Sequence, residues 1–170
     1  HPLIGRILKL GDPEVSAFAT LEGVECKARI DWYQDLDDHR KISVVRGGVP
    51  FSVDSSAVHL YDLKTVSKGV AEQESFSKYV GNYGLHVQAA LYYDIVGTVL
   101  GSPPARFSWI AVERDPPHLM AVNAADDWLE IGRREYRQNL QNYRAWMRLN
   151  ASSREDIINS GYSEDERILP

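Results

Sequence analysis

Hydrophobic and polar residues alternate most regularly over residues 24–33, where every second position is apolar and most of the positions between are charged. This period of two predicts a β-strand with one buried and one solvated face. A β-prone run, residues 14–20, precedes it, and Leu21-Glu22-Gly23 between the runs has the composition of a turn. The two runs therefore predict a hairpin. The expected apolar face comprises Val24, Cys26, Ala28, Ile30 and Trp32.

Two longer segments show helical spacing instead. Residues 83–100 repeat apolar side chains at this interval and carry Gly97 and Gly101 near their end. Residues 124–149 predict the last long helix, in which Gly132 would let another element approach closely. The two apolar stripes are Leu85, Ala89, Tyr92 and Val96 in the first helix, and Leu129, Tyr136, Leu140, Tyr143 and Met147 in the second.

The remaining segments are shorter or less regular. Apolar runs at residues 58–65, 106–113 and 119–122 predict strands, and residues 2–10 predict one or two helical turns. We expect a polar linker from the third strand to about Ser77, a protruding hairpin around Gly47-Gly48 within the irregular residues 34–57, and a polar tail or loop at residues 151–170. The acidic cluster Asp35, Asp37 and Asp38 is compatible with a cation site, although a hydrated loop is the simpler interpretation.

Composition narrows the class of protein. A chain of 170 residues fits one domain, residues 1–170, and its 44% hydrophobic and 25% charged residues are those of a soluble globular protein without a membrane helix. One cysteine, Cys26, excludes an internal disulfide and any multi-cysteine metal site, which favours a cytoplasmic protein. The net charge of −5 argues against nucleic-acid binding by bulk positive charge, but a site that holds divalent cations supplies its own. Because the sequence begins His-Pro-Leu-Ile, we expect that an N-terminal part of the full protein is missing.

The most suggestive chemistry lies at the end of the strand predicted over residues 58–65. Asp62 and Lys64 are two positions apart, so on a strand they share a face. A carboxylate that can bind a cation beside an ammonium that can hold water or a phosphate oxygen suits metal-assisted phosphodiester hydrolysis, although an ordinary ion pair is the alternative. Asp31 ends the polar face of the hairpin just before two aromatic residues.

Further polar side chains lie on the two long helices. Gln88 and Tyr92 are one turn apart and can reach a strand end or a phosphate together, or they are a buried aromatic beside a structural amide. A strip of four arginines accompanies the apolar stripe of the last helix. These guanidinium groups either track phosphates or pair with nearby acids. The four are Arg133, Arg137, Arg144 and Arg148.

Taken together, these segments resemble the PD-(D/E)xK nuclease superfamily, and within it the RecE-like phage and prophage exonucleases of the exodeoxyribonuclease VIII type. The resemblance rests on the order and spacing of five pieces. These are Glu14 opening a strand, the first-acid segment 23–31 (GVECKARID), the D-x-K segment 62–65 (DLKT), the Q-x-x-x-Y helix segment 83–92 (YGLHVQAALY) and the segment 129–134 (LEIGRR).

The resemblance implies an α/β fold, a restriction-endonuclease-like core with a mixed central sheet flanked by helices. It further implies that Asp31, Asp62 and the Leu63 carbonyl bind Mg²⁺ or Mn²⁺, and that Lys64 positions or activates the attacking water. Glu14 is expected as a partial substitute for a ligand that the family often carries on a preceding helix, which is absent or truncated here. The long insertion between Asp31 and Asp62 is a second departure. The DNA contacts that we expect are Arg29, Gln88, Tyr92, Arg133, Arg137 and Arg144, with Gln88 and Tyr92 also in the catalytic set.

In function, the resemblance implies a Mg²⁺-dependent exonuclease that resects double-stranded DNA ends 5′ to 3′ and leaves a 3′ single strand for an annealing recombinase. A ring-shaped homo-oligomer in the cytoplasm of a bacterial host belongs to the same expectation. A structure-specific or restriction-like endonuclease on the same core is the main alternative. A catalytically silent DNA-binding module is disfavoured by the presence of Asp31, Asp62 and Lys64, and an iron-sulfur Cas4-like nuclease is excluded by the single cysteine.

Overall fold

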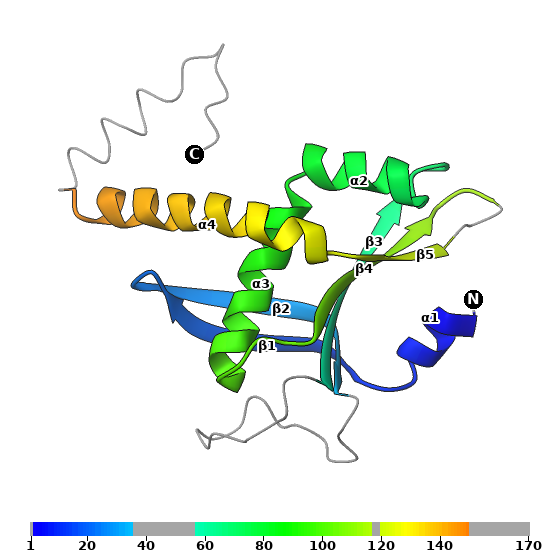
Figure 1. Cartoon of the computed structure of the whole chain (residues 1–170), viewed down its shortest axis with the longest axis horizontal. Helices are drawn as coiled ribbons and strands as arrows, with labels where there is room; N and C mark the ends of the chain where they lie inside the picture. Colours follow the sequence, from blue (N-terminus) through cyan, green and yellow to red (C-terminus); the bar gives the residue numbers. More distant parts are fainter. Residues whose placement is uncertain (1, 36–56, 117–119, 150–170) are drawn as a thin grey trace, which may run out of the picture.

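The computed structural model describes residues 2–35, 57–116 and 120–149 (Figure 1). Helices and strands follow one another in an order that agrees closely with the hydrophobic patterns. The elements are α1 (Pro2–Ile7), β1 (Asp12–Leu21), β2 (Val24–Asp35), β3 (Val58–Val66), α2 (Gln73–Asn82), α3 (Leu85–Leu100), β4 (Arg106–Glu113), β5 (Met120–Ala124) and α4 (Asp126–Met147).

The five strands form one mixed sheet in the order β1-β2-β3-β4-β5. Neighbouring strands are antiparallel except β3 and β4, which are parallel. Parallel neighbours need a crossover connection, and α2 with α3 supplies it between these two strands. The expected hairpin is β1 and β2, with Leu21 paired to Val24 at its tip. The predicted mixed sheet with flanking helices is therefore confirmed.

The main core lies between the sheet and the three longer helices. α3 packs on β1 and β2, and α4 packs on α3 (Figure 1). Gly132 makes the second contact possible, since a Cβ at this position would lie 2.7 Å from the His86 carbonyl carbon of α3. The prediction that another element approaches closely at Gly132 is confirmed.

The short helix α1 covers part of the other face of the sheet. Its Ile4 and Ile7 pack with Tyr61 and Ile110 in a second, smaller cluster. Trp32 joins this second cluster, whereas Ile30, two residues earlier on β2, belongs to the main core. The expectation of one apolar face from Val24 to Trp32 is therefore wrong for its last member. The next residue, Tyr33, belongs to the main core, so the side of β2 that faces this core changes between Ile30 and Tyr33, at the level where Glu14 of β1 has a positive φ.

Two other expectations need correction. The presumed linker before Ser77 contains the first half of α2, whose sequence is mostly polar but buries Phe76 and Val80 at i, i+4 spacing. The apolar stripe of α4 is buried only along its first half, because the later Tyr143 and Met147 are exposed. The hairpin predicted around Gly47-Gly48, Asp37 and Asp38 of the acidic cluster, and the tail at residues 151–170 lie outside the described residues.

Among the described helices, none combines the length and the apolar character that crossing a membrane would require.

Candidate active site

The register between β2 and β3 brings Asp31 and Asp62 together although they are 31 positions apart in the sequence. Trp32 pairs with Tyr61 in this antiparallel ladder, so the next step of the same register places Asp31 opposite Asp62. Directly opposite residues on antiparallel strands have neighbouring Cβ atoms and side chains on the same face. The two carboxylates, one from each strand of the sheet, therefore converge at one place.

Lys64 and Gln88 complete a set of mutual contacts around Asp62. Lys64 Nζ lies 2.6 Å from Asp62 Oδ2 and donates a hydrogen bond to Gln88 Oε1 at 3.3 Å. Gln88 Nε2 in turn donates to Asp62 Oδ1 at 3.4 Å. The predicted shared face of Asp62 and Lys64 is thus present, and α3 contributes the amide that bridges them. The ion pair is also present, so both interpretations of the D-x-K motif describe the same geometry.

Asp62 is an unusually placed carboxylate, because only 4% of the residue is exposed. Burial raises the pKa of this carboxyl above its ordinary value, Lys64 opposes the rise, and the nearby Asp31 carboxylate adds to it. Apart from the ion pair with Lys64, Asp62 Oδ2 is buried and accepts no aligned hydrogen bond within the described residues. The ionised form of Asp62 is therefore poorly compensated by the protein.

Leu63 lies between these two residues and directs its backbone at Asp31. Its N–H donates to Asp31 Oδ2 at 2.8 Å. In an extended strand the N–H and C=O of one residue point to the same side, so the Leu63 carbonyl also points toward the Asp31 side of β3. The Leu63 side chain is exposed. The oxygen atoms that this part of the sheet can offer to a cation are therefore the two carboxylates and the Leu63 carbonyl.

This set of oxygen atoms fits Mg²⁺ or Mn²⁺. Mg²⁺ is commonly held through one or two carboxylates and retains several of its waters, so a cage of protein ligands is not required. No group of three or more His, Cys, Asp or Glu residues with metal-binding geometry occurs among residues 2–35, 57–116 and 120–149. A divalent cation between Asp31 and Asp62 would neutralise the charge that burial leaves uncompensated.

Comparison with known proteins agrees with this geometry. Residues 48–156 match the family model described as a PDDEXK-like domain of unknown function, DUF3799. The chain belongs to this PDDEXK-like family. None of the curated proteins matches the sequence.

A solved structure supports the PDDEXK-like fold. The crystal structure of a "Putative exonuclease" from Eubacterium rectale superposes with a TM-score of 0.54 at 17% sequence identity. The superposition covers 83% of this chain and 50% of that protein, so this chain spans about half the length of its structural neighbour. Asp62, Lys64 and Gln88 of the PDDEXK-like chain lie inside the segment matched by the family model, whereas Asp31 precedes it.

Glu14 does not join the two aspartates in the structure. The β1–β2 register places Glu14 opposite Asp31, but its φ of 58° interrupts the regular extended backbone and its carboxylate pairs with Arg29. The expected role of Glu14 as a partial metal ligand would require this ion pair to open. Arg29 is therefore also engaged, although its side chain is well exposed.

Tyr92 lies one turn after Gln88 on α3 and is half-buried against the main core. The pKa of the Arg29 guanidinium is raised mainly by Glu14, with smaller contributions from Asp31 and Tyr92. Tyr92 and Arg29 thus flank the site, while Gln88 contacts it directly.

The arginines expected as a strip on α4 contact residues outside the group formed by Asp31, Asp62, Lys64 and Gln88. Arg133 donates three hydrogen bonds of 2.9–3.0 Å to Asp94 of α3 and lies 3.6 Å from Glu130. Arg137 approaches Glu22 at 3.9 Å. For these two residues the structure shows pairing with acids, the second of the two alternatives, while Arg144 lies beside Gly23 at the hairpin tip.

Asp94 is the residue that sequence reasoning missed. It anchors Arg133, and it also accepts a hydrogen bond of 2.6 Å from the Tyr136 hydroxyl. Burial, together with this hydrogen bond, raises the pKa of the Tyr136 phenol to about 12. A signal was available, because Asp94 is the only Asp, Glu, Lys or Arg in α3. A lone charge in an apolar helix needs a partner when that helix packs in a core.

Proposed function

We propose that the chain is a Mg²⁺-dependent deoxyribonuclease domain in which Asp31, Asp62 and Lys64 form the catalytic centre. The observation that carries this proposal is the convergence of the two aspartates through the β2–β3 register, with Lys64 and Gln88 in contact with the more buried one. A structural ion pair alone would not need a second carboxylate that raises the pKa of the first.

In this proposal Asp31, Asp62 and the Leu63 carbonyl hold the cation. A bound Mg²⁺ supplies a water of lowered pKa and positive charge beside the phosphate. The chain itself contributes the position of Lys64, whose ammonium can donate a hydrogen bond to the attacking water and stabilise charge that develops on the phosphate oxygens. Gln88 restrains Lys64 and Asp62 relative to each other, because its amide contacts both. Tyr92 and Arg29 are the proposed contacts for the DNA end.

We further propose the RecE-like activity: 5′-to-3′ resection of double-stranded DNA ends that leaves a 3′ single strand for an annealing recombinase. Three observations support it. The motif order in the sequence resembles those exonucleases, the chain belongs to a PDDEXK-like family, and its structural neighbour is described as a "Putative exonuclease". A homo-oligomeric ring would provide processivity to a chain with a net charge of −5.

The test is digestion of linear and covalently closed circular duplexes of the same sequence in the presence of Mg²⁺, with EDTA and the Asp62→Asn variant as controls. We expect degradation of the linear duplex alone, with a 5′ label released before a 3′ label. Cleavage of the closed circle would select an endonuclease. A folded protein that binds DNA but cleaves neither substrate would select the silent DNA-binding module.

The ring has a separate test. Light scattering coupled to size-exclusion chromatography should give a mass that is a multiple of the 19.2 kDa chain, and a strictly monomeric protein would contradict the proposed ring without affecting the catalytic centre.

A further inference from the structure

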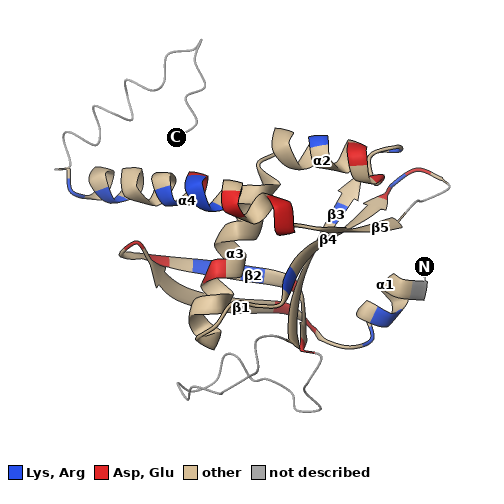
Figure 2. Cartoon of the chain, in the orientation of Figure 1, with Lys and Arg blue, Asp and Glu red and all other residues tan. Residues whose placement is uncertain are grey.

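The last three turns of α4 differ in charge from the rest of the molecule. Residues 137–148 contain no Asp or Glu but three arginines, in a chain whose net charge is −5. The beginning of the same helix is acidic, with Asp126, Asp127 and Glu130. Figure 2 shows this separation along α4, with acidic positions toward β5 and basic positions toward the opposite end.

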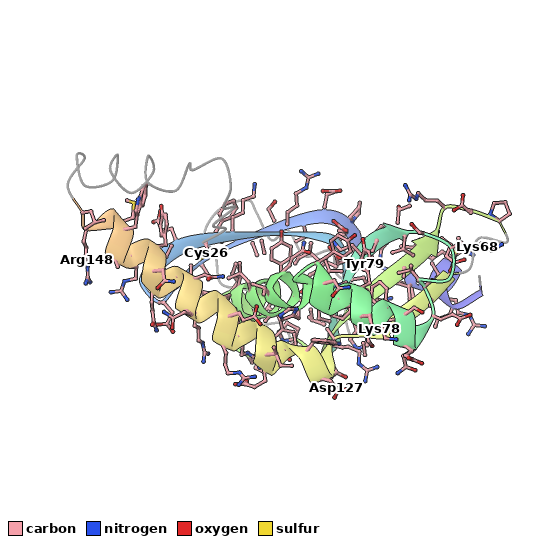
Figure 3. The ribbon with its side chains drawn as sticks, turned by 90° about the horizontal axis from the view of Figure 1, so that it is seen from above. Cys26, Lys68, Lys78, Tyr79, Asp127 and Arg148 are labelled. Atoms are coloured by element: carbon pink, nitrogen blue, oxygen red, sulfur yellow. The ribbon has the colours of Figure 1, made fainter. Side chains whose placement is uncertain are left out.

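Exposed aromatic and apolar side chains occupy the same three turns. Tyr143 is 47% exposed and Met147 is 45% exposed, unlike the buried Leu129 and Tyr136 on the earlier part of the helix. The ring of Tyr143 stacks on that of Trp146, with centroids 5.9 Å apart and an interplanar angle of 28°. Arg148 ends the helix at the outer end of the molecule (Figure 3). Aromatic faces and guanidinium groups thus alternate on one exposed segment.

We propose that this segment of α4, residues 143–148, is a binding platform for single-stranded nucleic acid. Unpaired bases stack on exposed aromatic rings, and a polyanionic backbone is complementary to an arginine-containing segment without carboxylates. A duplex offers only its phosphates to such a surface, because its bases are already stacked. The platform is distinct from the catalytic centre. Trp146 lies 14 residues, or about 21 Å of helix, beyond Gly132, which contacts α3 near Gln88.

A second copy of the chain is the competing occupant, since the acidic beginning of α4 could attract the basic end of a neighbour. The structure favours nucleic acid for two reasons. A stable protein interface buries roughly 800 Å² on each partner, whereas the exposed apolar groups here follow one narrow strip of a single helix. The exposed Tyr143 ring, which contacts Trp146, also offers an aromatic surface on which a base can stack.

The first experiment measures the binding of a fluorescently labelled oligothymidylate by anisotropy, in EDTA so that no cleavage occurs. Tyr143→Ala should weaken binding about fivefold or more, because stacking contributes at least this factor per base. Phe18→Ala is the matched control, since Phe18 is a 59% exposed aromatic with Lys27 over its ring but lies on β1 rather than α4. It should bind as the unmodified protein does. Equal affinities for Tyr143→Ala and the unmodified protein would overturn the proposal.

The second experiment measures the salt dependence of the same binding. Arg148→Gln should reduce the slope of log affinity against log salt by about 0.7, the value for one phosphate contact on a single strand. Arg6→Gln, an exposed arginine on α1, should leave the slope unchanged. If Tyr143→Ala instead lowered the oligomer mass while leaving single-strand affinity intact, the platform would be a protein interface. Because neither measurement needs divalent metal or cleavage, failure of the platform and failure of the proposed nuclease function are distinguishable.

Discussion

α3 contacts a carboxylate–cation cluster on each of two sides, and the carboxylates of the two clusters differ in how many partners they have. On one side Gln88 contacts Asp62 and Lys64 of β3; on the other, six residues or about one and two-thirds turns further on, Asp94 binds Arg133 and Tyr136 of α4. Both carboxylates are withdrawn from solvent, since only 17% of the Asp94 side chain is exposed. Asp94 accepts four hydrogen bonds, whereas Asp62 has one ion pair and a long bond from an amide.

The difference separates a structural carboxylate from one that is prepared for a ligand. The Asp94 carboxylate accepts hydrogen bonds from Arg133 and Tyr136 on both of its oxygen atoms. The bidentate Arg133 guanidinium thereby joins α4 to α3. Asp62 is left with a raised pKa because burial outweighs the attraction of Lys64, and Asp31 adds a second negative group nearby. A cation bound beside Asp62 would compensate its negative charge, as Arg133 already does for Asp94. The following predictions test this contrast.

The largest expected effect is the loss of cleavage in Asp62→Asn. The amide keeps the size of the side chain but removes the charge that would hold the cation, so nuclease activity on linear duplex should fall by orders of magnitude. Circular dichroism should show an unchanged fold. A folded variant that keeps most of its activity would remove Asp62 from the catalytic centre.

Lys64→Ala should abolish cleavage while leaving Mg²⁺-dependent DNA binding largely in place. The reason is that both carboxylates remain, while the ammonium that would position water is gone. Parallel measurements of cleavage and of duplex affinity with Mg²⁺ separate these roles. A joint loss of binding and cleavage would identify Lys64 as a phosphate anchor.

Asp94→Asn should act on stability rather than on chemistry. It leaves the Arg133 guanidinium half-buried beside a neutral amide, so we expect a cost of about 2 kcal/mol in the free energy of unfolding. Urea denaturation measures this cost, and assays below the unfolding transition should show cleavage by the folded fraction. A stability unchanged from that of the unmodified protein would mean that the α3–α4 contact does not depend on this pair.

Without divalent metal, Asp62→Asn should change stability in the opposite direction. A raised pKa means that the ionised carboxylate is less stable in the folded chain than in water, so its removal should stabilise the fold. A gain of about 1 kcal/mol would raise the Tm by roughly 2 to 4 °C. Mg²⁺ should raise the Tm of the unmodified protein but not that of the variant. A lower Tm for the metal-free variant would show that the pair with Lys64 outweighs burial.

The local elements of this fold could be predicted from sequence because each has its own period. Alternation gave the β1–β2 hairpin, and helical spacing gave α3 and α4. The helix α2 was missed because only Phe76 and Val80 reach the core, too few apolar positions to show a period. The solvent exposure of Tyr143 and Met147 could not be predicted either, because it depends on how far α4 extends beyond the elements that it packs against.

The site itself was partly predictable. The shared face of Asp62 and Lys64 follows from strand geometry alone, and helical spacing indicated that Gln88 could reach a strand end. The proximity of Asp31 to Asp62 depends on strand register. The hydrogen bonds from Arg133 to Asp94 depend on how α4 packs on α3, because the two residues are 39 positions apart in the sequence. These are tertiary contacts, so they cannot be predicted from the local pattern of hydrophobic and polar residues.

The smallest expected effect concerns Arg137, whose guanidinium lies 3.9 Å from Glu22 with half of its side chain exposed. Exposed pairs contribute only about 0 to 1 kcal/mol, so Arg137→Gln should change the free energy of unfolding by no more than this. Its neighbour Arg133 is bound on the side of α3 away from Gln88, so we also expect the salt dependence of duplex binding to stay unchanged. The measurement is best made on the Lys64→Ala background with Mg²⁺, where DNA remains intact. If the slope of log affinity against log salt instead fell by about 0.9, Arg137 would contact a duplex phosphate. The α4 side of α3 would then bind DNA as well, and its ion pairs would have to open when DNA arrives.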